Sequence, residues 1–291
     1  ICVILLCRSV VSNIEITEGQ NVHKKGFDRT ELDVLINKGR RLSPAEIGVC
    51  ASVGKSTIEV SKPPKCIIVS SGNELVDVNQ TPQAHQIRKS NVHQLASTLM
   101  AKGINPDLEH LQDEESVIEE KLNSFLSEYD VIIISGGVSK GKFDFIPNCL
   151  DRQGVEKLFH KVEQRPGKPF WFGKHPNGTV VFAFPGNPVS SFMCAMAYFI
   201  PWLDKSLATS DESLQTAVLA EDIMFKPDLT FFVQVKIESG LGKPIAIPVK
   251  GKGSGDLANL VDADGFLILP QGETKYTAGS EFQFIGYRNL I

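Results

Sequence analysis

Side chains able to bind phosphate and a metal ion recur in several short segments of this chain. Carboxylates occur at Glu74, Asp113 and Asp144, and cations occur at Arg165 and Lys168. Carboxylate oxygens are hard ligands suited to Mg²⁺, and fixed cations hold oxyanions. The combination predicts a pocket for an anionic ligand together with a hard metal ion, with Glu74 and Asp113 as the metal ligands.

Three apolar runs lead directly into loops of small residues. The loops are Ser70-Ser71-Gly72 after residues 67–69, Ser135-Gly136-Gly137 after residues 131–134, and Pro185-Gly186-Asn187-Pro188 after residues 180–184. Such runs are typical of buried parallel strands, and ligands of open α/β sheets bind beyond the carboxyl ends of the strands. We therefore expect the three loops to line one pocket.

These loops offer donors for oxyanions. Gly136 and Gly137 allow the backbone to approach a ligand closely and expose N–H groups, and Ser139 adds a hydroxyl. In residues 165–169, the prolines and the glycine stiffen the loop that carries the two cations. Residues 184–191 begin a helix whose N-terminus attracts anions.

Two segments resemble a phosphate-binding P-loop without matching it. Residues 136–143 fit the spacing G-x4-G-K but place Phe143 where a metal-binding Ser or Thr belongs. Residues 48–56 have five intervening residues instead of four and follow a helix rather than a strand. These departures argue against a P-loop NTPase.

The elements that position these residues alternate between strand and helix from residue 65 to about 203, which is typical of a parallel α/β domain. The predicted helices cover residues 91–102, 114–126 and 189–203, and a further strand covers residues 108–111. We expect a central parallel-sheet α/β domain over residues 65–206.

The two ends of the chain differ from this domain. Residues 1–64 carry short strand patterns at 3–6, 14–16 and 57–60 and one helix at 43–53, where Ser43 and Glu46 form a capping box; they predict the remnant of a β-rich lobe. Residues 207–291 carry strand patterns at 230–237, 266–269 and 281–285, separated by glycine and proline turns. These patterns predict a small β-barrel.

Composition narrows the class of protein. The 291 residues are 42% hydrophobic and 22% charged with a net charge of −4, which argues against nucleic-acid and membrane-surface partners. The six cysteines form no CxxC pair, which favours a reducing compartment. The apolar stretch at residues 1–6 is shorter than the ~7–15 residues of a signal peptide's apolar region, so we expect a cytoplasmic protein. The start at Ile1 favours a fragment that is incomplete at its N-terminus.

The motifs together resemble one family. They are SSGNEL at residues 70–75, Ser90-Asn91, SGGVSKGKFD at residues 135–144, RPGKP at residues 165–169 and FPGNPVS at residues 184–190, flanked by GQN and KGFD at 19–28 and by GSG and ADG at 253–265. In order and spacing they resemble the molybdopterin molybdenumtransferases, of the MoeA and gephyrin E-domain type.

The resemblance implies a cytoplasmic homodimer that takes adenylylated molybdopterin and molybdate, releases AMP and inserts molybdenum into the dithiolene. It implies a role for Glu74, Asp113 and Asp144 in Mg²⁺ binding and hydrolysis of the adenylate. It implies ligand binding by the small and cationic residues of the motifs: Ser71, Gly72, Ser90, Asn91, Gly136, Gly137, Ser139, Arg165, Lys168, Pro185, Gly186, Asn187, Pro188 and Ser190. A partner's N-terminal lobe would complete the site.

The chain departs from the family pattern at several positions. Asn73 replaces an aspartate, Lys89 replaces the aspartate of D-S-N, Lys140 replaces a small or apolar residue, and Arg165 replaces a lysine. The family is also longer at its N-terminus. Two alternatives therefore stay open: a non-catalytic molybdopterin-binding or scaffold relative, and a molybdopterin adenylyltransferase.

Overall fold

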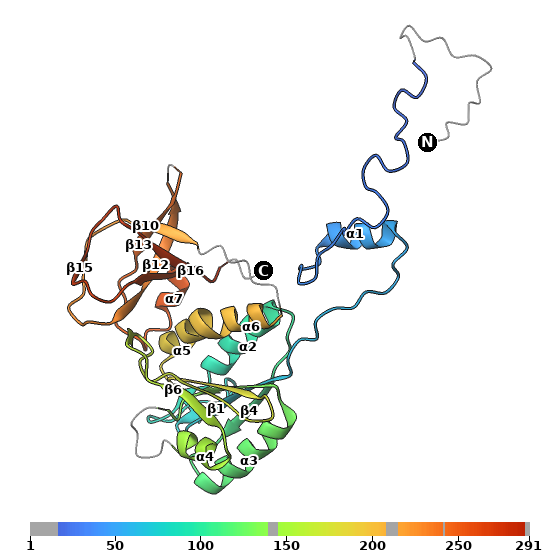
Figure 1. Ribbon diagram of the computed structural model, residues 1–291. Helices are drawn as coiled ribbons and strands as arrows, with labels where there is room; N and C mark the ends of the chain where they lie inside the picture. Colours follow the sequence, from blue (N-terminus) through green and yellow to red (C-terminus); the bar gives the residue numbers. More distant parts are fainter. Residues whose placement is uncertain (1–16, 139–144, 208–214, 241, 289–291) are drawn as a thin grey trace. The chain divides into compact units, whose positions relative to one another are not determined.

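The computed structural model describes residues 17–138, 145–207, 215–240 and 242–288. It divides into two units, Ile1–Ile58 and Glu59–Ile291 (Figure 1). The predicted site residues Ser139 and Asp144, and also Lys140, lie outside the described residues. The domain boundaries predicted at residues 65 and 207 stay predictions.

The first unit contains the predicted helix, α1 (Pro44–Ser52). Its capping box is formed: the Ser43 hydroxyl accepts from Ala45 N at 3.2 Å, and Ser43 N donates to the Glu46 carboxylate at 2.8 Å. The Ser43 hydroxyl also donates to the Glu46 carboxylate, and this bond, together with the Ser43 N–H bond and a contribution from Arg40, lowers the pKa of Glu46 to about 2. Gly54 follows the helix at φ +75°, as expected of a C-terminal glycine.

The strand predicted at residues 57–60 is wrong. This segment has no strand pairing, and Ile58 and Val60 are exposed. A short apolar pattern forms a strand only beside a partner that supplies hydrogen bonds, and within residues 17–64 the structure contains none. The strand patterns at residues 3–6 and 14–16 lie outside the described residues.

The second unit is built on a six-stranded sheet in the order β4-β1-β5-β9-β8-β6. Four strands are parallel: β1 (Cys66–Ser71), β4 (Asp107–Leu111), β5 (Val131–Ser135) and β9 (Val180–Phe184). At one edge, β8 (Trp171–Lys174) runs antiparallel to β9, and β6 (Glu156–His160) runs antiparallel to β8. The predicted parallel sheet is thus confirmed, and β1, β5 and β9 lie next to one another.

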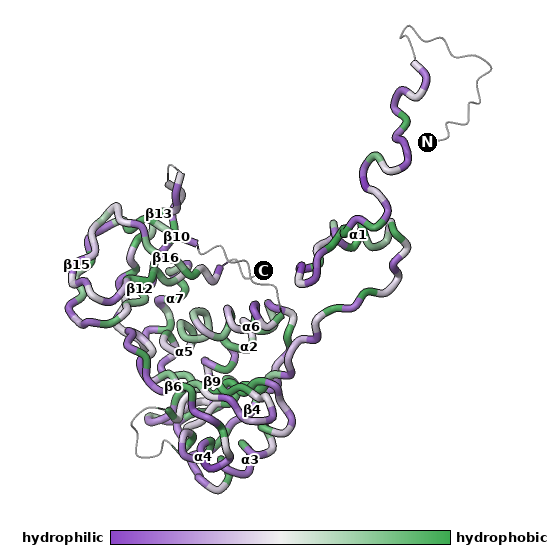
Figure 2. The backbone as a smooth tube through the Cα atoms, in the orientation of Figure 1, coloured by the Kyte–Doolittle hydropathy of each residue, from purple (hydrophilic) through white to green (hydrophobic). Residues whose placement is uncertain are grey.

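Helices cover both faces of this sheet (Figure 1). On one face α2 (Asn91–Ala101) and α5 (Pro188–Cys194) pack on Ile68, Ile133 and Phe182; on the other α3 (Glu115–Glu128) and α4 (Ile146–Arg152) pack on Ile67, Ile132 and Val181. Because both faces are buried, β9 is hydrophobic at every position, as the tube near its label shows (Figure 2), and β1 and β5 are hydrophobic up to their terminal serines.

The helix predicted over residues 189–203 is formed but is not uniform. It begins as α5, widens into a π-turn, η1 (Ala195–Phe199), and continues as α6 (Ile200–Ser206). Pro201 lies in the first turn of α6 and has no N–H to donate to the preceding turn, which is a common setting for such irregularity.

Five strands close into the predicted barrel. They are β10 (Thr216–Leu219), β12 (Thr230–Ser239), β13 (Pro244–Pro248), β14 (Gly265–Leu269) and β16 (Glu281–Gly286), and β12 pairs with both β13 and β14. The short helix α7 (Asn259–Asp262) lies between β13 and β14. Two small sheets complete the unit: β11 (Ile223–Met224) with β15 (Lys275–Tyr276), and β2 (Leu75–Val76) with β3 (Ile87–Arg88).

One strand crosses between the two parts of this unit. The two-residue β7 (Gln164–Arg165) precedes β8 in the chain but pairs in parallel with β12 of the barrel. The hydrophobic core also continues across: the Phe192 ring of α5 lies 5.1 Å from the Tyr287 ring of the barrel. The sheet and the barrel therefore share buried surface.

Candidate functional site

A cleft of about 1060 Å³ lies beyond the carboxyl ends of β1, β5 and β9. One side, which we call the α/β wall, consists of Ser70, Ser71, Glu74, Leu75 and residues 87–92, 135–137, 164–169 and 185–190. The other side, the barrel wall, consists of Leu229, Val249, Gly251, Leu257 and residues 231–234 and 253–255. The three strand-end loops therefore share one cleft, as expected.

The loops on the α/β wall touch one another through glycines. Gly136 has φ +102°, and a Cβ placed on it would lie 2.9 Å from the Ser71 carbonyl oxygen. Gly136 N donates to the Phe184 carbonyl at 3.1 Å, which joins the second loop to the end of β9. A side chain at this position would push the first and second loops apart.

Asn91, the first residue of α2, ties together the loops that follow β5 and β9. Its Nδ2 donates to the Ser135 hydroxyl at 2.8 Å and to the Gly186 carbonyl at 2.7 Å. Both N–H bonds of the amide are thereby used within the protein. Asn91 thus positions two loops of the α/β wall.

The first carboxylate of the site, Asp113, is bound to the loop after β1. It accepts from the Ser71 hydroxyl at 3.1 Å and from Asn73 N at 3.3 Å, while Asp113 N donates to the Asn73 side-chain oxygen at 3.0 Å. Asn73 thereby acts as a structural partner of Asp113. These bonds fix the carboxylate beside Ser71.

The second carboxylate, Glu74, folds back over the same loop. Its Oε2 lies 2.5 Å from the point that a Cβ on Gly72 would occupy, and Gly72 has φ +138°. Gly72 N in turn donates to the Leu111 carbonyl at 3.3 Å. Glycine at 72 therefore leaves the space that the Glu74 carboxylate fills.

Glu74 and Asp113 are an appropriate donor pair for Mg²⁺. They flank one loop, and Mg²⁺ is usually held by one or two carboxylates, several waters and the phosphates of a substrate. Among the described residues, no group of three or more His, Cys, Asp and Glu side chains is placed to hold a metal ion. The pair therefore fits a metal that is shared with a phosphorylated ligand, rather than a cage made by protein alone.

Two cations lie on the segment between β6 and β8, whose short strand β7 pairs with the barrel. Arg165 belongs to β7, and its guanidinium lies 6.0 Å from the centre of the Phe225 ring. Lys168 is exposed, and its carbonyl accepts from Val162 N at 2.9 Å. Both residues line the cleft, so an anion there would meet two positive charges.

The loop before α5 is joined to the barrel wall. Val189 N donates to the Ser254 carbonyl at 3.1 Å, and the Asn187 side chain donates to the Ser254 hydroxyl at 2.9 Å. One N–H group at the N-terminus of α5, that of Val189, is therefore bound to the barrel. The sequence analysis had expected the N-terminus of this helix to bind an anion.

Most of the predicted site residues line this cleft. They are Ser71, Glu74, Ser90, Asn91, Gly136, Gly137, Arg165, Lys168, Pro185, Gly186, Asn187, Pro188 and Ser190. The other two described candidates are not lining residues but contact them: Gly72 leaves space for the Glu74 carboxylate, and Asp113 accepts from the Ser71 hydroxyl. The structure thus brings all the described candidates together, and their roles stay predictions.

Two groups of residues that line the cleft were not predicted from the sequence. The first is the barrel wall from β12, for which the glycine-rich segment 251–255 was the available signal. The second is the pair Arg88 and Lys89 from β3 and the turn before α2. In the sequence these two adjacent cations follow no periodic pattern, so they cannot be told apart from charged residues on a solvated surface.

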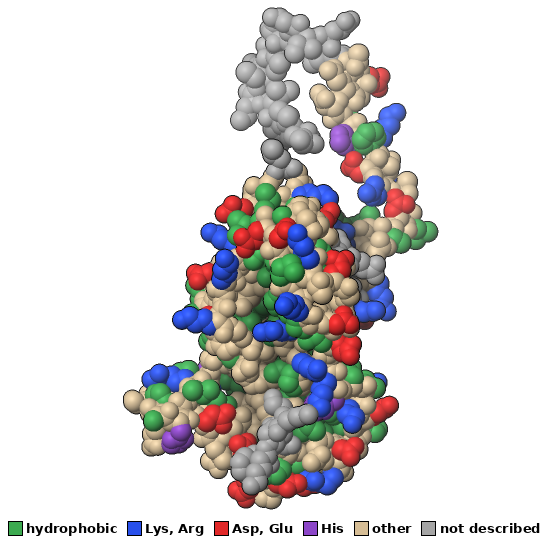
Figure 3. All heavy atoms as spheres, turned by 90° about the vertical axis from the view of Figure 1, so that its left-hand side faces the viewer, with side chains coloured by type: hydrophobic (Ala, Val, Ile, Leu, Met, Phe, Trp, Pro, Cys, Tyr) green, Lys and Arg blue, Asp and Glu red, His purple; other side chains and the backbone are tan. Residues whose placement is uncertain are grey.

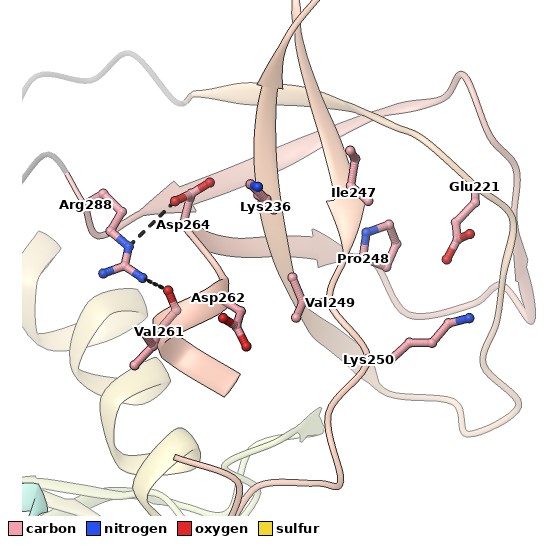
Figure 4. Close-up of a pocket in the computed structure, with 10 residues that line it drawn as sticks. All are labelled: Glu221, Lys236, Ile247, Pro248, Val249, Lys250, Val261, Asp262, Asp264 and Arg288. Carbon is pink, nitrogen blue, oxygen red and sulfur yellow. Dashed lines mark hydrogen bonds and ion pairs between the residues drawn. The ribbon is translucent and has the colours of Figure 1, made fainter. Parts of the chain in front are cut away.

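A second, more open hollow of about 830 Å³ lies on the barrel (Figure 4). Its Arg288 donates to the Val261 carbonyl, and its Nε lies 3.6 Å from the Asp264 carboxylate. Asp264 in turn accepts from Ile237 N at 2.8 Å. Arg288 and Asp264 thus join α7 to the barrel strands, which is a structural task.

Charge on the surface is mixed. In Figure 3, basic and acidic side chains alternate over the visible face, with no broad region of one sign. This distribution agrees with the net charge of −4 and offers no field for a nucleic-acid backbone on that face. None of the described helices combines the length and the apolar character that crossing a membrane requires.

Comparison with known proteins shows the family. The family model described as a probable molybdopterin binding domain matches residues 67–205, and the model described as the MoeA C-terminal region (domain IV) matches residues 216–287. The chain is 38% identical over 272 residues to the molybdopterin molybdenumtransferase of Synechocystis, covering 92% of this chain and 67% of the relative. It is 30% identical over 270 residues to that of Bacillus subtilis, covering 92% and 63%.

Solved structures agree with these relatives. A molybdopterin biosynthesis MoeA protein from Pyrococcus horikoshii superposes with a TM-score of 0.79 at 26% identity, covering 92% of this chain and 65% of that one. A second structure of a MoeA protein from this organism gives 0.71 at 25% identity, with 89% and 63% covered. The chain spans about two thirds of the length of the relatives it matches. On the strength of these matches, the chain belongs to the family of the molybdopterin molybdenumtransferases.

Proposed function

We propose that this protein acts in molybdenum cofactor biosynthesis, as a transferase that inserts molybdate into adenylylated molybdopterin and releases AMP. The observation that carries the proposal is the assembly of the described parts of the five motifs around one cleft, with two carboxylates at the loop after β1 and two cations at residues 165–168. Carboxylates that can hold a metal ion and cations that can hold an oxyanion suit a ligand with a phosphoanhydride and a second ligand that is an oxyanion. Residues 65–206 would form the ligand-binding domain and residues 207–291 the barrel domain.

In this proposal the chain's own groups bind and orient the ligand. Gly136, Gly137 and Ser71 hold phosphate oxygens, while Arg165 and Lys168 hold molybdate. A water molecule attacks phosphorus, the phosphoanhydride bond breaks, and AMP departs. The two S–H groups of the released dithiol then bind molybdate: both sulfurs form bonds to molybdenum, their two protons go to one oxo ligand, and that oxygen leaves as water.

The carboxylates Glu74 and Asp113 would hold Mg²⁺. The ion would neutralise the charge on the phosphoanhydride oxygens while that bond breaks. The Ser71 and Asn73 contacts keep Asp113 in one orientation, so little ordering is needed when the ion binds.

A homodimer in the cytoplasm is also part of the proposal. Large apolar side chains of the first unit are exposed, among them Leu32 at 95%, Val34 at 75% and Phe27 at 72%. Such exposure favours packing against another surface, and we propose the cleft region of a second copy. A reducing compartment is supported by the free thiols of Cys50, Cys66, Cys149 and Cys194 among the described residues.

The test is the release of AMP. The protein is incubated with adenylylated molybdopterin, molybdate and Mg²⁺, and AMP is quantified by chromatography. We expect AMP release that depends on both Mg²⁺ and Glu74. A protein that binds the adenylylated pterin without releasing AMP would instead be a non-catalytic binding relative, and formation of adenylylated molybdopterin from ATP would indicate the adenylyltransferase.

A further inference from the structure

Lys89 has an unusual position for a lysine. Its side chain is 14% exposed, it lines the cleft, and it lies between β3 and α2. Its backbone N–H donates to the Val76 carbonyl at 2.9 Å, which fixes the backbone beside β2. An ammonium group that is largely removed from water needs a partner of opposite charge.

Lys89 forms an ion pair with Asp77, whose carboxylate oxygen lies 2.5 Å from its Nζ. Asp77 is mostly exposed, at 60% for its side chain, and does not belong to either wall of the cleft. Ion pairs with such an exposed member contribute little to stability, since water competes for the carboxylate. An ammonium also carries three donors, so one carboxylate contact leaves capacity for a ligand.

The basic neighbours of Lys89 are less suited than Lys89 to bind a ligand phosphate. His110, nearby on β4, has its pKa lowered by burial and by the charge of Lys89, which favours its neutral form. The Arg88 Nε donates to the Val78 and Gln80 carbonyls at 3.1 and 3.2 Å, which directs it to its own loop.

Arg165 and Lys168 lie elsewhere in the cleft. Arg165 pairs through β7 with the barrel strand β12, whereas Lys89 neighbours His110 on the edge strand β4. A cleft of about 1060 Å³ is larger than a single small oxyanion requires. The separation of the cations therefore fits a ligand with two separated anionic groups.

We infer that Lys89 binds a phosphate group of the ligand at the β4 end of the cleft, and that Asp77 holds its ammonium there until the ligand arrives. The inference rests on the proposed function and extends it to a residue that sets the position of the nucleotide phosphate. Arg165 and Lys168 serve the second oxyanion. Lys89 is thus a binding residue, and Asp77 is its positioning partner.

The experiment separates a ligand contact from a structural ion pair. Binding of AMP and of molybdate to the 291-residue chain is measured by calorimetry for wild type, Lys89→Met and Asp77→Asn, which break the same ion pair. We expect Lys89→Met to weaken AMP binding about tenfold or more, as for a lost charge-assisted hydrogen bond, with molybdate affinity unchanged. Asp77→Asn should bind AMP at least as tightly as wild type.

Two further variants complete the test. Lys89→Arg should retain most of the AMP affinity, and Lys168→Met should weaken molybdate binding instead. Equal loss of AMP affinity in Lys89→Met and Asp77→Asn, or no loss in Lys89→Met, overturns the inference. If wild type binds AMP and molybdate and Lys89→Met binds AMP as tightly, only the inference about Lys89 fails. If wild type binds neither AMP nor molybdate, the proposed function fails as well.

Discussion

The two walls of the cleft are held together by different kinds of contact. On the α/β wall, side chains such as Asn91 and Asp113 cross between loops, and Gly136 allows a backbone approach that no other residue would permit. On the barrel wall, the contact to α5 is made by the carbonyl and the hydroxyl of Ser254, and much of the remaining lining is apolar. The comparison indicates that the α/β wall depends on residue identity, while the barrel wall depends more on backbone position.

The largest effect is expected at a carboxylate of the α/β wall. Glu74→Gln removes a charge that would hold Mg²⁺, so we expect AMP release to slow by roughly 10²-fold or more. The matched substitution Glu238→Gln lies on an exposed position of β12 outside the cleft and should leave the rate unchanged. A Glu74→Gln rate close to that of wild type would remove Glu74 from the chemistry.

Gly136→Ala should cause the largest loss of stability. The added Cβ meets the Ser71 carbonyl oxygen, and the backbone at φ +102° disfavours any side chain, so the free energy of unfolding should fall by about 2–4 kcal/mol. Gly103→Ala is the control, because Gly103 also has positive φ but open space around its Cβ position. Denaturant titration should show a loss of about 1–2 kcal/mol for the control, and equal losses would mean that the loop contact is unimportant.

Asn91→Ala tests whether one amide holds two loops together. It leaves the Gly186 carbonyl and the Ser135 hydroxyl without this donor, so we expect a loss of about 1–3 kcal/mol and weaker binding of AMP. Ser90→Ala removes a neighbouring hydroxyl whose contact to Asn91 is long, 3.5 Å, and should change stability far less. Thermal unfolding and calorimetry measure the two quantities, and similar losses of stability in the two variants would contradict the bridging role.

The smallest effect is expected on the barrel wall. Ser254→Ala removes the hydroxyl that accepts from Asn187 but keeps the carbonyl that accepts from Val189 N. The cost should be about 0.5–1.5 kcal/mol, the net value of one hydrogen bond. A loss as large as that of Asn91→Ala would show that side chains matter equally on both walls.

The sequence predicted the α/β wall well for a physical reason. Continuous apolar runs identify buried parallel strands, and glycines and small residues mark their ends, so the loops at 70–72, 135–137 and 185–188 were placed correctly from local patterns alone. The helix predicted at residues 43–53 from its capping residues likewise forms, over residues 44–52.

The remaining features depend on contacts that no local pattern encodes. The partners of Asn91 are 44 and 95 residues away in the chain, and the ion pair of Lys89 depends on how β2 and β3 lie together. The failed strand at 57–60 had the right local pattern without a neighbouring strand. Apart from the glycine-rich segment 251–255, the barrel wall depends on the closure of β12 on β13.

The short strand β7 has a consequence for how the ligand and the barrel influence each other. Arg165 is a cleft residue by position but a member of the barrel sheet by its backbone pairing with Phe231. An anion bound by Arg165 would act on β12 through this backbone pairing. Binding in the cleft and the position of the barrel would then be thermodynamically linked. Such linkage is reciprocal. If a bound anion strengthens an interaction that holds the barrel in place by some factor, that interaction raises the affinity for the anion by the same factor.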